Sequence, residues 1–131
     1  MPMKKMLVIC TFLMLVSCNE GADTRTINFP KSVEIVNKIP DKRNVWVFIL
    51  AGQSNMAGRA FVEPKDTLSN KRILTIDKEE QLIYAKEPLH FYEPAMTGLD
   101  YGTSFGEAII EGIPDTISVL LIPTAVGGSS V

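Results

Sequence analysis

The segment best suited to chemistry is residues 52–59, which read Gly-Gln-Ser-Asn-Met-Ala-Gly-Arg. It directly follows residues 45–50, an apolar run rich in β-branched and aromatic residues that predicts a buried strand. Ligands of open parallel sheets bind at the carboxyl ends of the strands, where a serine in this segment would lie. Ser54 is therefore a candidate nucleophile, because amides at a helix start can stabilise an oxyanion. The same spacing also suits a turn in which Ser54 or Asn55 only caps a helix.

Several other classes of function do not fit the sequence. Three residues separate Ser54 from the next glycine, so the Gly-x-Ser-x-Gly elbow of α/β hydrolases is absent. The glycine spacing also differs from that of dinucleotide-binding and phosphate-binding loops, and no lysine follows at the phosphate position. The composition is ordinary for a globular protein, with 46% hydrophobic and 21% charged residues and a net charge of −2. We therefore expect no nucleic-acid partner.

The elements around residues 52–59 predict a layered α/β domain. Residues 117–122 form a second apolar run. Continuous rather than alternating hydrophobicity indicates a strand buried on both faces, as in the centre of a parallel sheet. Shorter and more exposed strands are expected at residues 72–76 and 81–84. Buried strands with a helix leading into the second one are typical of a sheet covered by helices.

The clearest helical pattern lies at residues 103–111. Phe105, Ala108 and Ile109 have the i, i+3, i+4 spacing of one buried helix face, and Gly112 should end the helix. A second helix with a weaker pattern is expected within residues 53–60 or just after them.

The amino terminus has the pattern of an export signal. Two lysines precede residues 6–16, an uncharged apolar run shorter than the roughly 20 residues needed to span a bilayer. Ser17 and Cys18 end this run in a way that resembles the bacterial lipobox, in which the cysteine is diacylated and becomes the new N-terminus. An ordinary signal peptide with an incidental cysteine is the alternative. Cys10 would leave with the signal, so no intramolecular disulfide is expected.

These patterns divide the chain into three parts. Residues 1–17 are expected to be a signal peptide, and Cys18 would anchor an exported protein to the bacterial cell envelope, facing the periplasm or the surface. Residues 18–43 are polar and contain two prolines, which predicts a lipid-anchored tether and an irregular lead-in. Residues 44–131 would form the globular part.

Three segments carry a resemblance to a known family. Residues 52–59 resemble the first block of the sialate O-acetylesterase branch of the SGNH hydrolases, which has Gly-Gln-Ser where lipolytic relatives have Gly-Asp-Ser. Residues 98–106 are similar to the family's second block, and residues 122–130 to its Gly-Gly-Thr/Ser stretch after a core strand. Three blocks in the right order make the resemblance fairly specific.

The resemblance implies a three-layer, flavodoxin-like fold with a parallel sheet between helices. It also implies hydrolysis of O-acetyl esters on carbohydrates, without a cofactor or a metal. Ser54 would form an acetyl-enzyme that water then releases. The backbone amides of Ser54 and Gly102 would form part of the oxyanion hole, although Gly102 also suits plain entry into a helix. The residues that would line the substrate pocket are Gln53, Asn55, Gly127, Gly128 and Ser129.

Two parts of the family pattern are not found in the 131 residues, a Gln-Gly-Glu-like block and the Asp-x-x-His motif that supplies the base. The single histidine, His90, has Glu87 three residues before it, so we expect a loop residue near the pocket rim rather than a base. We expect the sequence to hold about half of a catalytic domain, incomplete at the C-terminus, and to be catalytically poor alone. The alternatives are a non-catalytic surface lipoprotein that binds glycans and an exported fragment without function.

Overall fold

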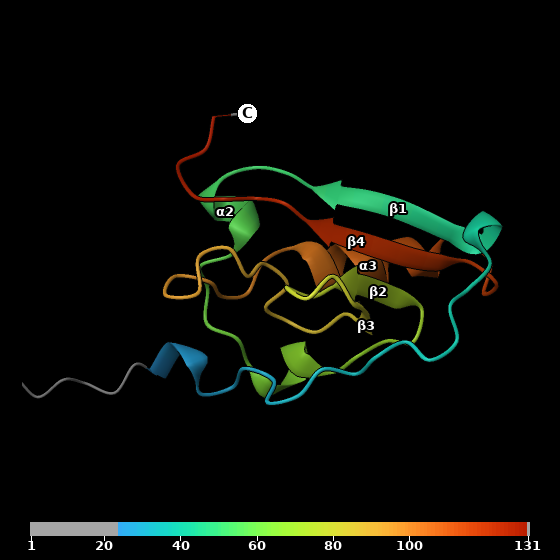
Figure 1. The fold of residues 1–131 in the computed structure, drawn as a ribbon, viewed down its shortest axis with the longest axis horizontal. Coiled ribbons are helices and arrows are strands. Elements are labelled where there is room, and N and C mark those ends of the chain that lie inside the picture. Colours follow the sequence, from blue (N-terminus) through green and yellow to red (C-terminus); the bar gives the residue numbers. More distant parts are fainter. Residues whose placement is uncertain (1–23, 131) are drawn as a thin grey trace, which may run out of the picture.

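The structure is a computed structural model that describes residues 24–130 (Figure 1). The predicted signal peptide and Cys18 lie outside the described residues. The helices and strands, in chain order, are the 3-10 helices η2 (Thr24–Thr26) and η3 (Lys42–Asn44), strand β1 (Val45–Leu50), helix α2 (Ser54–Ala57), the 3-10 helix η4 (Pro64–Thr67), strands β2 (Ile73–Ile76) and β3 (Leu82–Tyr84), helix α3 (Gly102–Glu111) and strand β4 (Ser118–Pro123).

The strands form one mixed sheet in the order β1-β4-β2-β3. β1 and β4 are parallel, in register from the pair Val45–Ser118 to the pair Leu50–Pro123. β2 is also parallel to β4, whereas β2 and β3 form an antiparallel hairpin. The prediction that the two apolar runs pair in parallel within an α/β fold is confirmed. Parallel pairing brings the carboxyl ends of β1 and β4 to one edge of the sheet, and α2 follows β1 at that edge (Figure 1).

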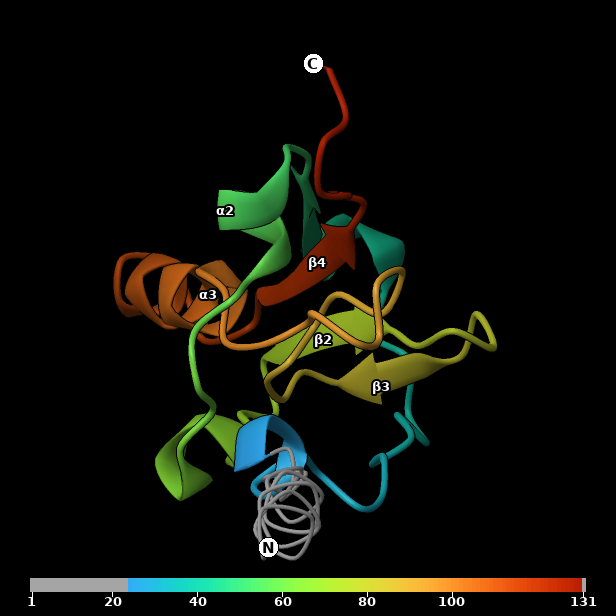
Figure 2. The same cartoon turned by 90° about the vertical axis from the view of Figure 1, so that its left-hand side faces the viewer.

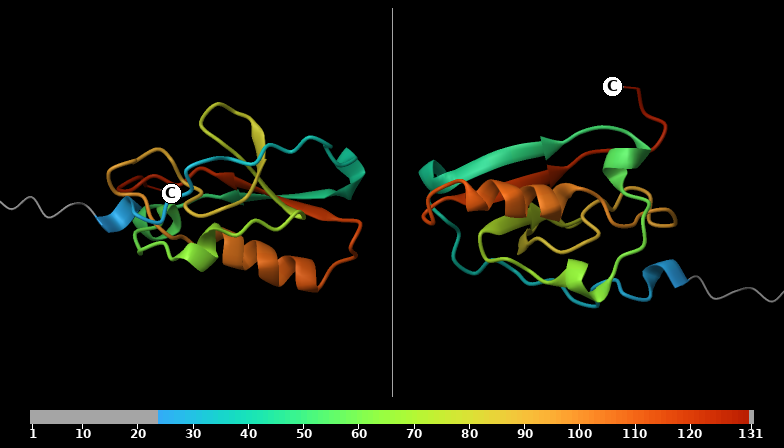
Figure 3. Two further views of the ribbon diagram at one scale, coloured as in Figure 1. Left: turned by 90° about the horizontal axis from the view of Figure 1, so that it is seen from below. Right: turned by 180° about the vertical axis from the view of Figure 1, so that it is seen from behind.

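α3 lies across one face of the sheet and forms the main core with it (Figure 3). The side chains of β4 alternate between buried and half-buried, so every second residue points at the helix. The core cluster between helix and sheet consists of Leu50, Ile73, Ala85, Leu89, Ile110, Val119 and Leu121.

α3 begins one residue before its predicted start, but its buried face is not the predicted one. Gly106 and Ile110 face the sheet, whereas Ala108 is exposed and Phe105 is 37% exposed. A Cβ atom added to Gly106 would lie 2.9 Å from Cγ2 of Ile73, so the glycine lets the helix approach the sheet closely. The face that packs therefore combines Gly106, which allows the close approach, with Ile110 and the partly buried Ile109.

The burial of the strands also differs from the prediction. β1 is an edge strand among the described residues, and Val47 and Ile49 are 57% and 67% exposed. Burial of β1 on both faces was therefore a wrong expectation, because no described element covers that face. β2 was expected to be more exposed, yet its first three residues are buried because it lies between β4 and β3. Position in the sheet decides burial here, and the length of the apolar run does not.

Residues 24–43 pack against the domain. Residues 34–36 run antiparallel beside β3 through two backbone hydrogen bonds of 2.9 and 3.0 Å. Nearer the start, Nη1 of Arg25 donates to the backbone oxygen of Arg59 at 2.9 Å. In Figure 1, η2 (blue) and α2 both lie towards the left of the view, and Figure 2 shows α2 above η2. The described part of the predicted tether and lead-in, residues 24–43, is therefore attached to the domain.

Candidate active site

Ser54 lies at the carboxyl edge of the sheet, as the first residue of α2. It is half-buried, and within residues 24–130 neither its Oγ nor its backbone N–H takes part in a hydrogen bond. The capping alternative is not observed, because Gln53 occupies the N-cap position and no side chain caps the helix. α2 has only four residues, so single amides rather than a helix dipole would act on a ligand. Ser54 thus has a hydroxyl and an amide available for chemistry.

The first and second sequence blocks lie side by side. Leu99 N–H donates to the backbone oxygen of Ala60 at 2.9 Å, in an isolated antiparallel bridge. Gly58 adopts a φ of +78°, and a Cβ atom there would lie 2.8 Å from Cβ of Asp100. A glycine is therefore needed both for the backbone conformation and for the close approach. This contact brings the segment around Asp100 next to the segment that carries Ser54.

The third block joins the first through the backbone. Thr124 N–H donates to the Leu50 oxygen at 3.1 Å, and Val126 N–H donates to the Gly52 oxygen at 3.2 Å. Ser129 Oγ also donates to the Gly52 oxygen, at 3.2 Å. All three blocks therefore converge at the carboxyl ends of β1 and β4. No hydrogen bond within the described residues links Ser54 directly to Gly102, so their joint role stays a prediction.

The predicted pocket residues differ in their surroundings. Gln53, Asn55, Gly128 and Ser129 are exposed, as expected of residues that meet a ligand. Whether each of them contacts a substrate stays a prediction.

Gly127 is half-buried, and its N–H donates to Oε2 of Glu93 at 2.6 Å. The same oxygen accepts from Nη2 of Arg59 at 2.7 Å. The Gly127 amide, and after it the Arg59 guanidinium, hold the pKa of the Glu93 carboxyl below its usual range. This clamp fastens the loop after β4 to the first block.

The Gly102 amide is already occupied. Gly102 is buried against Leu50, and its N–H donates to Oδ1 of Asp100 at 2.6 Å. The predicted oxyanion donor is therefore paired with a carboxylate of the chain itself. Gly102 can serve a substrate oxygen only after Asp100 releases or shares this N–H.

Asp100 belongs to a buried polar cluster that the sequence did not predict. Its Oδ2 lies 2.6 Å from Nδ1 of His90, and its N–H donates to Oε2 of Glu87 at 3.3 Å. The other oxygen of Glu87 accepts from the N–H and the hydroxyl of Thr103, at 3.2 and 2.8 Å. Burial, and after it the Asp100 carboxylate, raise the pKa of Glu87 to about 7. Three ionisable side chains thus meet beneath the start of α3.

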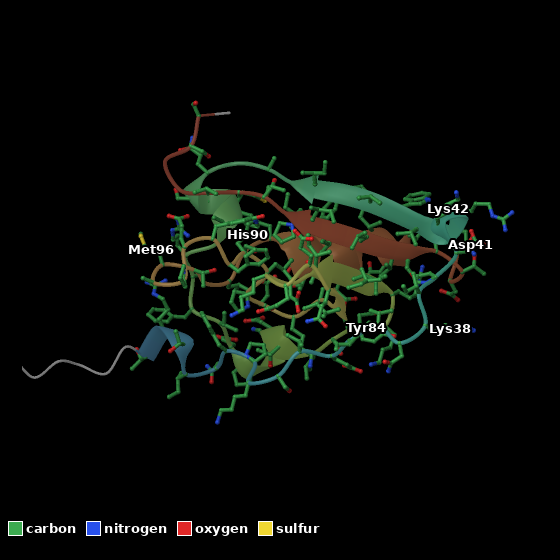
Figure 4. All side chains as sticks on the ribbon, in the orientation of Figure 1. Lys38, Asp41, Lys42, Tyr84, His90 and Met96 are labelled. Atoms are coloured by element: carbon green, nitrogen blue, oxygen red, sulfur yellow. The ribbon has the colours of Figure 1, made fainter. Side chains whose placement is uncertain are left out.

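His90 is part of the interior, in contrast to the expected place at a pocket rim. Its residue surface is 3% exposed, and Figure 4 places it between α2 and the end of β4. Its Nε2 lies 3.4 Å from the backbone oxygen of Leu50. Both ring nitrogens therefore face partners other than Ser54, so this arrangement does not make His90 its base.

Two concave regions border these elements. A pocket of about 240 Å³ is lined by Asn55, Arg59, Ala60, Leu99, Asp100 and Tyr101, next to the first block. A larger cavity of about 470 Å³ lies between the lead-in, the β2–β3 hairpin and the loop around His90. Ser54 is not among the residues that line either region. We place the candidate site beside the smaller pocket, because it is lined by Asn55, the neighbour of Ser54, and by residues of the first and second blocks.

Within residues 24–130, no group of three or more His, Cys, Asp or Glu side chains could hold a metal ion. None of the helices in this described part of the chain combines the length and the apolar character needed to cross a bilayer.

The sequence itself decides the family. Residues 44–131 match the family described as carbohydrate esterase, sialic acid-specific acetylesterase. The chain belongs to this family. The resemblance drawn from residues 52–59, 98–106 and 122–130 is thereby confirmed.

Two solved structures are similar to this esterase-family chain. A protein from Arabidopsis thaliana has 28% identity and a TM-score of 0.57, over 66% of this chain and 42% of its own. NanS has 19% identity and a TM-score of 0.51, over 65% of this chain and 36% of its own. The α/β fold is consistent with part of the flavodoxin-like SGNH fold, and this chain spans less than half the length of either structure. Comparison with curated proteins found no significant match.

Proposed function

We propose that this chain carries the nucleophile of a serine esterase that removes O-acetyl groups from carbohydrates. The observation that carries the proposal is the convergence of three sequence blocks around an unpaired Ser54, at the carboxyl ends of β1 and β4. Membership in an acetylesterase family gives the substrate class, an acetylated carbohydrate. Gln53, Asn55, Gly128 and Ser129 would contact the sugar, and Gly127 would shape the loop that presents them.

In the proposed reaction, Ser54 Oγ attacks the acetyl carbonyl carbon and forms an ester. The bond from that carbon to the sugar oxygen breaks, and the sugar oxygen leaves as a hydroxyl after taking up the proton that Ser54 Oγ gives up. Water then attacks the acetyl-enzyme and releases acetate. The Ser54 amide is available to the oxyanion, and the Gly102 amide would join it after Asp100 moves, each such donor contributing about 3 kcal/mol.

Serine nucleophiles are usually activated by a neighbouring base. No described side chain donates to or accepts from Ser54 Oγ, and His90 is engaged elsewhere. The absence of a bonded base within residues 24–130 favours one second candidate, a lipoprotein that binds acetylated glycans without cleaving them. We retain the lipid anchor on Cys18 and export to the bacterial envelope as part of both proposals.

Hydrolysis of 4-nitrophenyl acetate and of O-acetylated sugars, with Ser54→Ala beside the unchanged chain, tests the reaction. We expect Ser54→Ala to hydrolyse both substrates more slowly than the unchanged chain does. Ser118→Ala, at the opposite end of β4, should hydrolyse them at the unchanged rate. Equal hydrolysis by Ser54→Ala would refute the nucleophile. Binding of an acetylated glycan with no hydrolysis would favour the second candidate.

A further inference from the structure

The sequence alone gives His90 no role, but its side chain connects two parts of the candidate site. Nδ1 lies 2.6 Å from Asp100 Oδ2, and Nε2 lies 3.4 Å from the Leu50 oxygen. The Leu50 oxygen can only accept, and so can an ionised Asp100. A neutral imidazole has one N–H, which Nδ1 would donate to Asp100 in the shorter contact, and the 3.4 Å contact would be a hydrogen bond only with a proton on Nε2 as well. The shorter contact has the length of a charge-assisted hydrogen bond. The His90 ring thus lies between Asp100 and the last carbonyl of β1, the strand that leads to Ser54.

The second oxygen of Asp100 faces the proposed oxyanion donor. Oδ1 accepts from Gly102 N–H at 2.6 Å in the buried interior. A carboxylate oxygen in this position resembles a developing oxyanion, because both are negatively charged oxygens at hydrogen-bond distance from an amide. The backbone of Asp100 is held in turn by Glu87, which is 0% exposed. Asp100 is therefore fixed from two sides while it occupies the amide.

We propose that Asp100 masks the Gly102 amide and that His90 holds this mask in place. The inference deepens the proposed function and rests on it, since it concerns a donor for the acetyl oxygen. A substrate oxygen receives this N–H only when Asp100 turns away or shares it. Until then the amide stays oriented towards a negative oxygen and shielded from water. His90 is the positioning residue, because its bond to Asp100 must stretch before the carboxylate can leave.

A simple helix cap is the competing explanation for the Asp100–Gly102 bond. In that case Asp100 only satisfies an amide at the start of α3. A cap and a mask both protect the amide from exchange with water. They differ in the response to a weakened carboxylate, because only a masked donor then becomes available to another anionic oxygen.

Amide hydrogen exchange at Gly102, measured by NMR in the full chain, tests the hold of His90. His90→Asn places a donor nitrogen near the position of Nδ1, so Gly102 should stay protected. His90→Gln is the matched control. Its side-chain nitrogen would lie near the position of Nε2, so it would place no donor nitrogen beside Asp100. Exchange at Gly102 should then be at least about tenfold faster. Equal exchange in the two variants, or the opposite order, would overturn the proposal. If neither variant folds, rapid exchange at Gly102 in the unchanged chain would overturn it as well.

The mask itself is tested with Asp100→Asn and sodium acetate, the product of the proposed reaction. Asparagine keeps the shape of the side chain, but its neutral oxygen is a weaker acceptor than a carboxylate. Acetate should therefore shift the Gly102 amide resonance in Asp100→Asn more than in the unchanged chain, with sodium chloride at equal concentration as the control. If acetate does not shift the Gly102 resonance in either protein, Asp100 is only a helix cap and the proposed mask is rejected. If acetate shifts the resonance as expected but hydrolysis does not depend on Ser54, the proposed nucleophile is wrong and the proposed mask is still supported.

Discussion

Replacing Glu87 by glutamine should remove a pH-dependent loss of stability. The folded protein keeps Glu87 protonated up to a pKa of about 7, because burial and then Asp100 disfavour its charge, whereas the ordinary value is 4.5. A group with a raised pKa in the folded state contributes stability that is fully present below about pH 4.5. That contribution is lost as the pH rises through about 7. Glutamine cannot lose a proton, so Glu87→Gln should lack this loss.

The size of the effect is set by the change in pKa. A rise from 4.5 to about 7 corresponds to roughly 3 kcal/mol at 25 °C, at 1.36 kcal/mol per pH unit. Glutamine can still accept from the N–H and hydroxyl of Thr103 through its Oε1. Any fixed difference in hydrogen bonding is independent of pH. The titration of Glu87 is therefore measured by how the difference in free energy of unfolding, between Glu87→Gln and the unchanged chain, changes from pH 4.5 to pH 7.5.

Urea unfolding at a series of pH values gives this difference directly. The free energy of unfolding of Glu87→Gln, relative to that of the unchanged chain, should rise by roughly 3 kcal/mol between pH 4.5 and 7.5 and then level off. Glu111→Gln, at the exposed end of α3, is the control and should follow the unchanged chain. A difference for Glu87→Gln that does not vary with pH, or that grows towards acid, would refute the reasoning.

Three other substitutions have defined outcomes. Cys18→Ala should release the exported protein into the soluble fraction, because stable anchoring needs the two acyl chains; unchanged retention in detergent-phase partitioning would reject the anchor. Gly106→Ala should lower the free energy of unfolding in urea by about 1–3 kcal/mol, since the new Cβ would lie 2.9 Å from Ile73. Gly127→Ala should cost less than Gly106→Ala, because its Cβ would meet Nη2 of Arg59 at 2.5 Å and the carboxylate of Glu93, which are the ends of flexible side chains that can shift. Wild-type stability in Gly106→Ala, or a larger loss in Gly127→Ala, would contradict this reading of the contacts.

The central elements could be predicted from the sequence because their signals are local. The apolar runs at β1 and β4 and the helical pattern at α3 each lie within one short window, and the structure places them within one residue. Their burial could not be predicted in the same way. An apolar run does not reveal whether it will be an edge strand, as β1 is here, or lie between two others, as β2 does. The burial of a strand depends on which other strands pair with it, and these strands can lie far away in the sequence.

The polar part of the site shows the same limit. Ser54 was identified because strand, turn and serine are adjacent in the sequence. His90 and Asp100 are ten positions apart in the sequence, and the residues around each of them do not show the pattern of a buried strand or helix. One signal was present, since Glu87 and His90 lie on either side of Pro88 and Leu89 in a stretch that also holds Phe91. A charged residue in such a stretch is either exposed or paired in the interior, and the sequence alone does not choose between these.

The packing of the lead-in would limit the distance between the candidate site and a membrane under the proposed lipid anchor on Cys18. Arg25 bonds to the backbone of Arg59, five residues after Ser54, so the chain is already fastened beside the candidate site at that point. Six peptide steps separate Cys18 from Thr24, and even a fully extended chain of that length spans only about 20 Å. A diacylated Cys18 would therefore confine the esterase to a thin layer of water above the lipid headgroups. Its substrates would be glycans attached to that surface or able to reach it, and long polymers held farther out would be cleaved only where they fold back towards the bilayer.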